Sequence, residues 1–140
     1  MASLIYDSAL YDALTGAIDF GADDFKALLV GPGYLPDKAT HARRADVTDE
    51  IKGKGYQAGG GSVAVAARQA DGDTAISLGG ALWTAATLSA SGAVYFKTRG
   101  GPAADDELVA YIDFRGPVKA TNGDFRLDAS TIRLAPAPLQ

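Results

Sequence analysis

Short runs of alternating apolar and polar residues recur along most of the chain beyond residue 60. Alternation with a period of two is typical of strands that bury one face. Regular spacing with turn residues between the runs indicates an antiparallel β-sandwich or barrel. We therefore expect a mainly β fold of about seven to eight strands, located at 25–31, 62–69, 73–80, 81–88, 91–98, 107–114, 124–128 and 130–135.

One short helix is predicted near the N-terminus. Asp7 can cap a helix that runs to about Thr15, and Gly16 would end it, since glycine readily adopts the left-handed conformation that follows a helix. The apolar face of this helix should consist of Ala9, Leu10, Ala13 and Leu14.

Two dipeptides mark turns between the predicted strands. Asp71-Gly72 would close a hairpin between its two flanking runs, and Asn122-Gly123 is the strongest turn signal in the chain.

The run at 107–114 should present one apolar face, made of Leu108, Ala110, Ile112 and Phe114. Several of these strands should contribute to the core, where we expect largely buried side chains at Leu29, Trp83, Phe96, Ile112 and Phe114.

Residues 32–54 form a long polar stretch, with one helical turn expected near 46–51. A connection of this length is usually functional or ordered by a partner. Its basic and acidic side chains could meet opposite charges on a neighbouring protein, so the stretch is our candidate partner interface. The candidate residues are His41, Arg43, Arg44, Asp46, Asp49 and Glu50.

The glycine-rich segment at 53–61 contains a G-x-G-x-x-A pattern at Gly53, Gly55 and Ala58. A dinucleotide-binding loop needs a buried strand before it and a helix after it. Here a polar segment precedes the pattern, and further glycines and an alternating run follow it. We therefore interpret the glycines as structural, and expect 59–61 to have positive φ angles or to lie against another backbone.

Composition limits the function classes. The chain has 140 residues, 47% of them hydrophobic, which suits one domain over 1–140. Its net charge of −4 argues against nucleic-acid binding, which needs clustered Lys and Arg. Cysteine is absent, which excludes disulfides and zinc-thiolate sites. The N-terminal residues lack a basic region and a long apolar run, so we expect neither a signal peptide nor a membrane span, and production in the cytoplasm.

Candidate catalytic groups are few. His41, the only histidine, lies beside two arginines that would disfavour its imidazolium form. Carboxylates cluster at 23–24, 46–50 and 105–107, but a general acid must be buried, and we expect these to be solvated. They lack the spacing of a calcium loop, so neither a metal nor a cofactor is predicted. A hydrolase that uses Asp105 or Asp106 would need a cleft that the sequence does not indicate.

The aromatic residues on the predicted strands allow two interpretations. Trp83, Tyr95 and Tyr111 would form core if they point inward, or a sugar-stacking platform if they are exposed on one face. The second case would make the chain a small carbohydrate-binding β-sandwich. Burial of the three rings separates these alternatives.

The order of the short motifs resembles a family of small virion structural proteins of tailed bacteriophages. The similarity begins with the helix and the strand DFKALLVG, and continues through an acidic loop into a G-x-G-Y-x-x-G-G element. A tryptophan strand follows, and then the segments 92–96, 108–114 and 122–125. The resemblance covers nearly the whole chain and departs from the family at the C-terminal APAPLQ.

This resemblance implies a non-enzymatic particle component that decorates the capsid or is a minor head or tail protein. Its partners would be the major capsid protein or other virion proteins, together with further copies of itself on the particle. Neither nucleic acid nor membrane would be a partner. The chain would be located in virions assembled in the host cytoplasm. Many repeated weak contacts on a lattice would supply the binding strength of such a protein.

Overall fold

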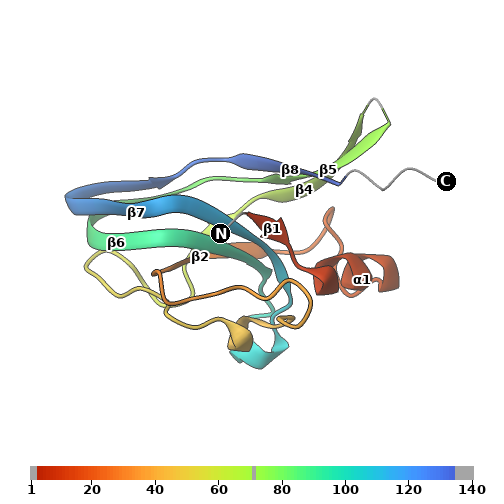
Figure 1. Ribbon diagram of the computed structural model, residues 1–140, viewed down its shortest axis with the longest axis horizontal. Helices are drawn as coiled ribbons and strands as arrows, with labels where there is room; N and C mark the ends of the chain where they lie inside the picture. Colours follow the sequence, from red (N-terminus) through yellow and green to blue (C-terminus); the bar gives the residue numbers. More distant parts are fainter. Residues whose placement is uncertain (1–2, 71, 135–140) are drawn as a thin grey trace.

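A computed structural model describes residues 3–70 and 72–134, which form two antiparallel β-sheets stacked as a sandwich (Figure 1). The five-stranded sheet has the order β1-β7-β6-β2-β3, and the three-stranded sheet has the order β4-β5-β8. The elements are β1 (Leu4–Ile5), α1 (Asp7–Thr15), β2 (Phe25–Val30), the 3₁₀ helix η1 (Arg44–Asp46), β3 (Gly61–Val63), β4 (Val65–Ala70), β5 (Asp73–Leu78), β6 (Ala81–Lys97), the 3₁₀ helix η2 (Ala103–Asp105), β7 (Leu108–Leu127) and β8 (Ser130–Leu134). The predicted mainly β sandwich with one N-terminal helix is confirmed.

The long strands β6 and β7 form an antiparallel ribbon that contributes to both layers. Figure 1 shows this ribbon turning over at the end of the molecule opposite α1. Two sequence-based expectations were wrong here. The runs at 81–88 and 91–98 are one strand, as are those at 107–114 and 124–128, so Asn122-Gly123 lies inside a strand and does not close a hairpin. Asn122 instead has a φ of 49° within β7, and β6 is bulged opposite it, so the turn-forming dipeptide bends a paired strand.

The chain changes sheets at short breaks between strands. The predicted strand at 62–69 is divided at Ala64 into β3 and β4, which belong to different sheets. The amide of Gly79, between β5 and β6, donates to the carbonyl of Ala64 at 2.6 Å and holds the two breaks together. The predicted hairpin of β4 and β5 is confirmed by the pairing of Ala70 with Asp73, although Asp71 lies outside the described residues.

The five-stranded sheet is apolar on both faces. One face packs on the three-stranded sheet through side chains such as Leu29, Trp83 and Tyr95. The other face carries a second cluster, the outer cluster, made of Tyr6, Leu28, Val30, Tyr34, Val94, Phe96, Leu108 and Tyr111. Tyr34 and the half-buried Val47, which packs on this cluster, belong to the polar segment 32–54. That segment therefore covers one face of the sheet.

Two of the predicted core positions are less buried than expected. Leu29, Trp83 and Phe96 are buried, as predicted, whereas Ile112 and Phe114 are only half-buried. Both lie on β7 beyond the two residues that pair with β1, at an edge of the sheet. Leu108 also departs from the predicted common face, because it joins the outer cluster while Ala110, Ile112 and Phe114 pack in or against the inner core.

Helix α1 presents a different face from the predicted one. Tyr6 occupies the N-cap position and Asp7 is the first helical residue, so Asp7 does not cap the helix. The buried positions are Ala9 and Asp12, whereas Leu10 and Leu14 are exposed. The carboxylate of Asp12 faces a group of charged residues inside the molecule, and this orientation leaves the leucines in solvent. The predicted stop at Gly16 is confirmed by its φ of 87°.

The glycine-rich segment packs against the sheet, and it contains a steric constraint. Gly59 and Gly60 have φ angles of 93° and 78°, as predicted, and Gly55 has one of 82°. Gly61 does not have a positive φ, and a Cβ there would make ordinary contact with Trp83. A Cβ on Gly60 would lie 1.8 Å from the carbonyl oxygen of Ala27. The close approach of two backbones therefore requires glycine at this position.

Replacement of Gly60 by Ala should lower the free energy of unfolding by about 3 kcal/mol or more, because the new methyl group collides with the backbone of β2. Gly59→Ala is the matched control. Its φ is similar, but the space around it is open, so it should cost only about 1 kcal/mol. Urea unfolding of both variants measures the difference, and equal losses would contradict the steric explanation.

Candidate functional site

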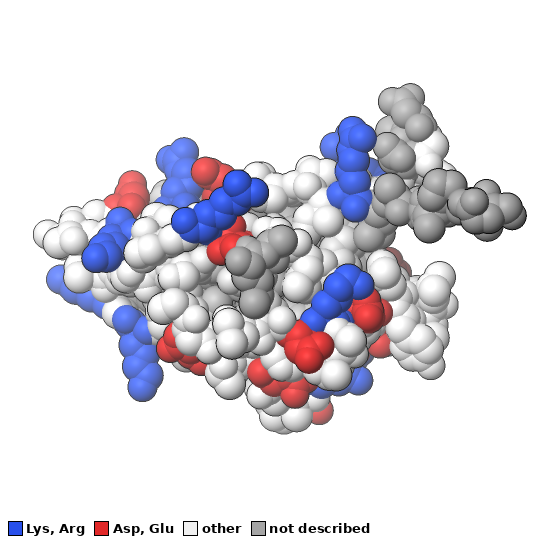
Figure 2. Space-filling view, viewed as in Figure 1, with Lys and Arg blue, Asp and Glu red and all other residues white. Residues whose placement is uncertain are grey.

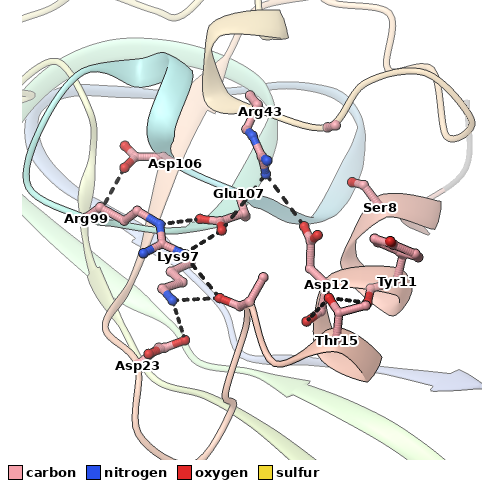
Figure 3. Close-up of polar contacts among 12 residues, drawn as sticks. Ser8, Tyr11, Asp12, Thr15, Asp23, Arg43, Lys97, Arg99, Asp106 and Glu107 are labelled. Atoms are coloured by element: carbon pink, nitrogen blue, oxygen red, sulfur yellow. Dashed lines mark hydrogen bonds and ion pairs between the residues drawn. The ribbon is translucent and has the colours of Figure 1, made fainter.

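A group of charged residues gathers where α1, segment 32–54 and the β6–β7 connection meet (Figure 3). We call it the ion-pair cluster. Its acidic and basic side chains come from α1, the loop after it, segment 32–54, the end of β6 and the β6–β7 connection. The members are Asp12, Asp23, Arg43, Arg44, Lys97, Arg99, Asp106 and Glu107.

Glu107 is at the centre of the cluster and is only 3% exposed. Arg99 donates from Nε to Oε1 at 2.8 Å and from Nη2 to Oε2 at 2.7 Å, which is a bidentate pair. These hydrogen bonds to Arg99 lower the pKa of Glu107 and outweigh the effect of its burial. The guanidinium of Arg43 lies on the other side, 4.0 Å from Oε2. Glu107 is therefore held in its ionised form.

The pKa of Asp12 is shifted in the opposite direction from that of Glu107. It is 7% exposed, and its Oδ2 has no hydrogen-bond partner within the described part of the chain. The Nη1 atom of Arg43 lies 3.7 Å from this oxygen, beyond hydrogen-bonding distance. Burial raises the pKa of Asp12 more than the positive charge of Arg43 lowers it. Asp12 and Glu107 thus flank one guanidinium while their pKa values shift in opposite directions.

Asp106 forms a second pair beside the first and is 1% exposed. Its Oδ2 accepts from Nε of Arg44 at 2.7 Å, and its Oδ1 accepts from the amide of Arg99 at 2.9 Å. The guanidinium of Arg44 also lies over the ring of Phe96, 5.1 Å from the centroid, in a cation–π arrangement. Through this pair, segment 32–54 is attached to the start of β7 and to the outer cluster.

The sequence-based expectation that the carboxylates at 105–107 are solvated was wrong for Asp106 and Glu107 and correct for the exposed Asp105. Asp106 and Glu107 directly precede a run of buried residues on β7, and arginines lie at 43, 44 and 99 to neutralise them. Adjacency to an apolar strand was the available signal. Burial of these charges depends on pairing across more than sixty residues of sequence for Arg44, which local patterns do not reveal.

Lys97 and Asp23 extend the cluster toward the loop after α1. The Lys97 ammonium lies 2.8 Å from the Asp23 carboxylate and donates to the carbonyl of Ala17 at 2.7 Å. Backbone and Lys97 hydrogen bonds lower the pKa of Asp23. Arg99 reaches the same Ala17 carbonyl at 3.3 Å. Together these contacts fasten the loop between α1 and β2 to the end of β6.

Two carboxylates with separated pKa values are the arrangement that enzymes use for acid and base roles. Here the two are Asp12 and Glu107: both oxygens of Glu107 accept from Arg99, and Oδ2 of Asp12 lies 3.7 Å from the guanidinium of Arg43. These groups connect chain segments to one another. Within residues 3–70 and 72–134, no group of three or more His, Asp or Glu side chains is placed to hold a metal ion.

The predicted interface residue His41 contacts other parts of the molecule. Its Nδ1 accepts from the amide of Asp37 at 3.1 Å and lies 2.9 Å from the hydroxyl of Tyr34. The Tyr34 hydroxyl is in turn 2.7 Å from that of Tyr6 in the outer cluster. His41 is therefore the half-buried end of a chain of side-chain hydrogen bonds.

The three predicted acidic interface residues stabilise the local backbone. Each places a carboxylate oxygen 2.7–3.0 Å from amide nitrogens of segment 32–54 or of the glycine-rich segment. The donors are the amides of Ala42 and Arg43 for Asp46, the amide of Gly33 for Asp49, and the Gly59 amide with the Tyr56 hydroxyl for Glu50. The expected helical turn near 46–51 was wrong: residues 47–51 are not helical, and the short 3₁₀ helix η1 lies before them at Arg44–Asp46.

The candidate sugar platform does not form. Trp83 is 8% exposed and packs edge-on against Phe125, with ring centroids 6.0 Å apart. Tyr95 is fully buried and its hydroxyl donates to the carbonyl of Gly79, while Tyr111 is buried in the outer cluster. All three rings are interior, so they offer no exposed face for stacking on a sugar.

Comparison of the chain with protein-family models, with characterised proteins and with solved structures gave no match. Among the residues that the structure describes, no helix is long and apolar enough to cross a membrane.

The opposite pKa shifts in the cluster predict opposite pH dependences for two isosteric variants. The lowered pKa of Glu107 contributes stability above its unfolded-state pKa, and this contribution is lost as the pH falls through the folded-state value. Glu107→Gln should therefore lower the melting temperature most near neutral pH and least in acid.

The raised pKa of Asp12 has the reverse consequence, because stability is lost as the pH rises from the unfolded-state pKa through the folded-state value. Relative to the unmodified protein, Asp12→Asn should therefore gain stability with rising pH. Thermal unfolding between about pH 3 and pH 8 covers both windows. Parallel pH profiles for the two variants would contradict this description of the cluster.

Proposed function

We propose that this chain is a non-enzymatic structural protein of a bacteriophage virion, which decorates or cements the capsid through protein–protein contacts. The order of its motifs supports the proposal through the resemblance described above. Its partners are the major capsid protein or other virion proteins, and further copies of itself. The protein acts by occupying a defined place on the particle.

The observation that carries the proposal is the distribution of exposed apolar side chains. Single exposed leucines are common, but clustered apolar surface marks a protein interaction site. Among the described residues, three large exposed apolar side chains are neighbours on α1, and single ones lie on segment 32–54 and on each of the two long strands. They are Leu10, Tyr11, Leu14, Leu35, Leu82 and Val118.

Segment 32–54 remains our candidate for contact with the shell. Its charged side chains hold its own conformation, so the loop is a shaped surface fixed on the outer cluster before any partner binds. A preformed surface loses little conformational entropy on binding. Leu35 projects from this surface with 68% of its area exposed. It is the apolar side chain of the segment that is available to a neighbour.

The test is attachment of the purified chain to particles assembled without it. Leu35→Asp should weaken attachment by about tenfold or more, since a leucine buried at an interface contributes roughly 1.5 kcal/mol or more. Leu82→Asp is the matched control, because Leu82 is a similarly exposed leucine on β6. Failure of the unmodified chain to attach would contradict the proposed function. Equal attachment of the two variants would exclude Leu35 from the interface.

A further inference from the structure

The geometry points to a specific contact between copies: we propose that this chain associates head to tail, with the exposed side chains of α1 in one copy seated in a groove beside β7 of the next. The inference rests on the proposed function, because it describes how a particle component contacts itself. It is carried by two different apolar surfaces, one on α1 and one on β7.

The receiving surface, which we call the β7 groove, lies between the two layers of the sandwich. Its volume is about 250 Å³. Half-buried Ile112 and Phe114 line it together with Val118, which is 43% exposed. The remaining lining residues, which come from the returning part of β7 and the start of β8, are Phe125, Arg126, Leu127, Asp128 and Ser130. The lining of the groove is thus mainly apolar, and its charged residues are Arg126 and Asp128.

The edge of β7 at the groove is poorly suited to pairing with another strand. Arg115 and Gly116 have φ angles of 61° and 135°, and Pro117 has no amide hydrogen to donate. Irregular backbone, proline and lysine are the features by which natural proteins prevent edge strands from pairing. Lys119 adds the last of these. The groove is therefore better suited to side chains of a partner than to an added strand.

The inserting surface, the helix patch, consists of Leu10, Tyr11 and Leu14 on α1. Residues three and four apart lie on one side of a helix, so the three side chains are neighbours. Leu14 is 87% exposed and Tyr11 is 67% exposed. Figure 1 places α1 at the end of the molecule opposite the bend of the β6–β7 ribbon. No residue that lines the β7 groove belongs to α1, so the helix patch and the groove can meet only between copies.

Charge favours this pairing over contact between two identical patches. Residues 7–24 contain five aspartates and no Lys or Arg. Asp7, Asp12 and Asp23 are paired with Lys38, Arg43 and Lys97, which leaves Asp19 and Asp24 to repel the same region of a second copy. Exposed Arg115, Lys119 and Arg126 lie along β7, and Figure 2 shows basic side chains over this part of the surface. Asp124 and Asp128 accompany them. Such charges mainly set the orientation of a contact, while the apolar side chains supply its stability.

A contact between different surfaces of identical chains leaves one free surface of each kind at the ends of every assembly. Such heterologous association forms a ring if the rotation closes and an open chain if it does not. The expected behaviour in solution is a concentration-dependent increase in mass beyond the dimer. Sedimentation velocity measures this increase.

Cysteine cross-linking tests the pairing directly, since the chain contains no cysteine. Leu14→Cys and Val118→Cys are made in separate copies, both at exposed positions where the fold should be retained. When mixed under mild oxidation, they should form a disulfide-linked dimer that neither variant forms alone. Leu35→Cys mixed with Val118→Cys is the control and should stay monomeric.

Cross-linking of Leu14→Cys with itself, or equal cross-linking in the control mixture, would overturn the inference. So would the absence of cross-linking at concentrations where the unmodified chain self-associates. A chain that stays monomeric at every concentration would also contradict it. Failure here is distinguishable from failure of the proposed function, because attachment to particles is measured separately and responds to Leu35. If Val118→Cys does not fold, Arg126→Cys supplies a second cysteine in the groove wall.

Discussion

The structure depends on covering the second apolar face of the five-stranded sheet. Leu28, Val30, Val94 and Phe96 point away from the three-stranded sheet and would be exposed if nothing lay over them. Segment 32–54 covers them, although it is polar and has little regular structure. Burying polar backbone against an apolar face is unfavourable unless its hydrogen-bonding groups are satisfied. The carboxylates of Asp46, Asp49 and Glu50 satisfy several of them.

The ion-pair cluster follows from the same constraint. A covering loop must be attached at its ends and at points along its length, and Arg43 and Arg44 attach this one to buried carboxylates at the start of β7. Buried ion pairs contribute little net stability compared with apolar packing, but removing one partner is costly, so they favour one arrangement of the segments. Asp12 faces the same cluster from α1, 3.7 Å from the guanidinium of Arg43, while Leu10 and Leu14 of this helix are exposed. The side of α1 that is available to a partner is thus set by the residues that the helix buries, Ala9 and Asp12.

Features set by local chemistry could be predicted from the sequence, while those set by distant pairing could not. The β segments, the helix bounds, most of the structural glycines and the buried Trp83 follow from periodicity and backbone preference, whereas the merging of four predicted strands into β6 and β7 does not. The bend at Asn122 could not be foreseen, because the dipeptide that closes hairpins also suits a bulged ribbon. Burial of Asp106 and Glu107 depends on arginines that arrive from other segments. The continuous apolar run of β2 was the one local sign that both faces of its sheet are covered.

The most direct test of this account is native-state hydrogen exchange of the amides in segment 32–54. The Arg44 amide donates to the carbonyl of Asp106, and the Ile51 amide donates to that of Leu29 in β2. If the segment is a fixed cover of the outer cluster, these two amides should be protected in the isolated protein and should open together with the edge of the sheet. Exchange of both at the rate of an unfolded chain, while β2 and β6 remain protected, would show that the segment is not a fixed cover and would contradict the account.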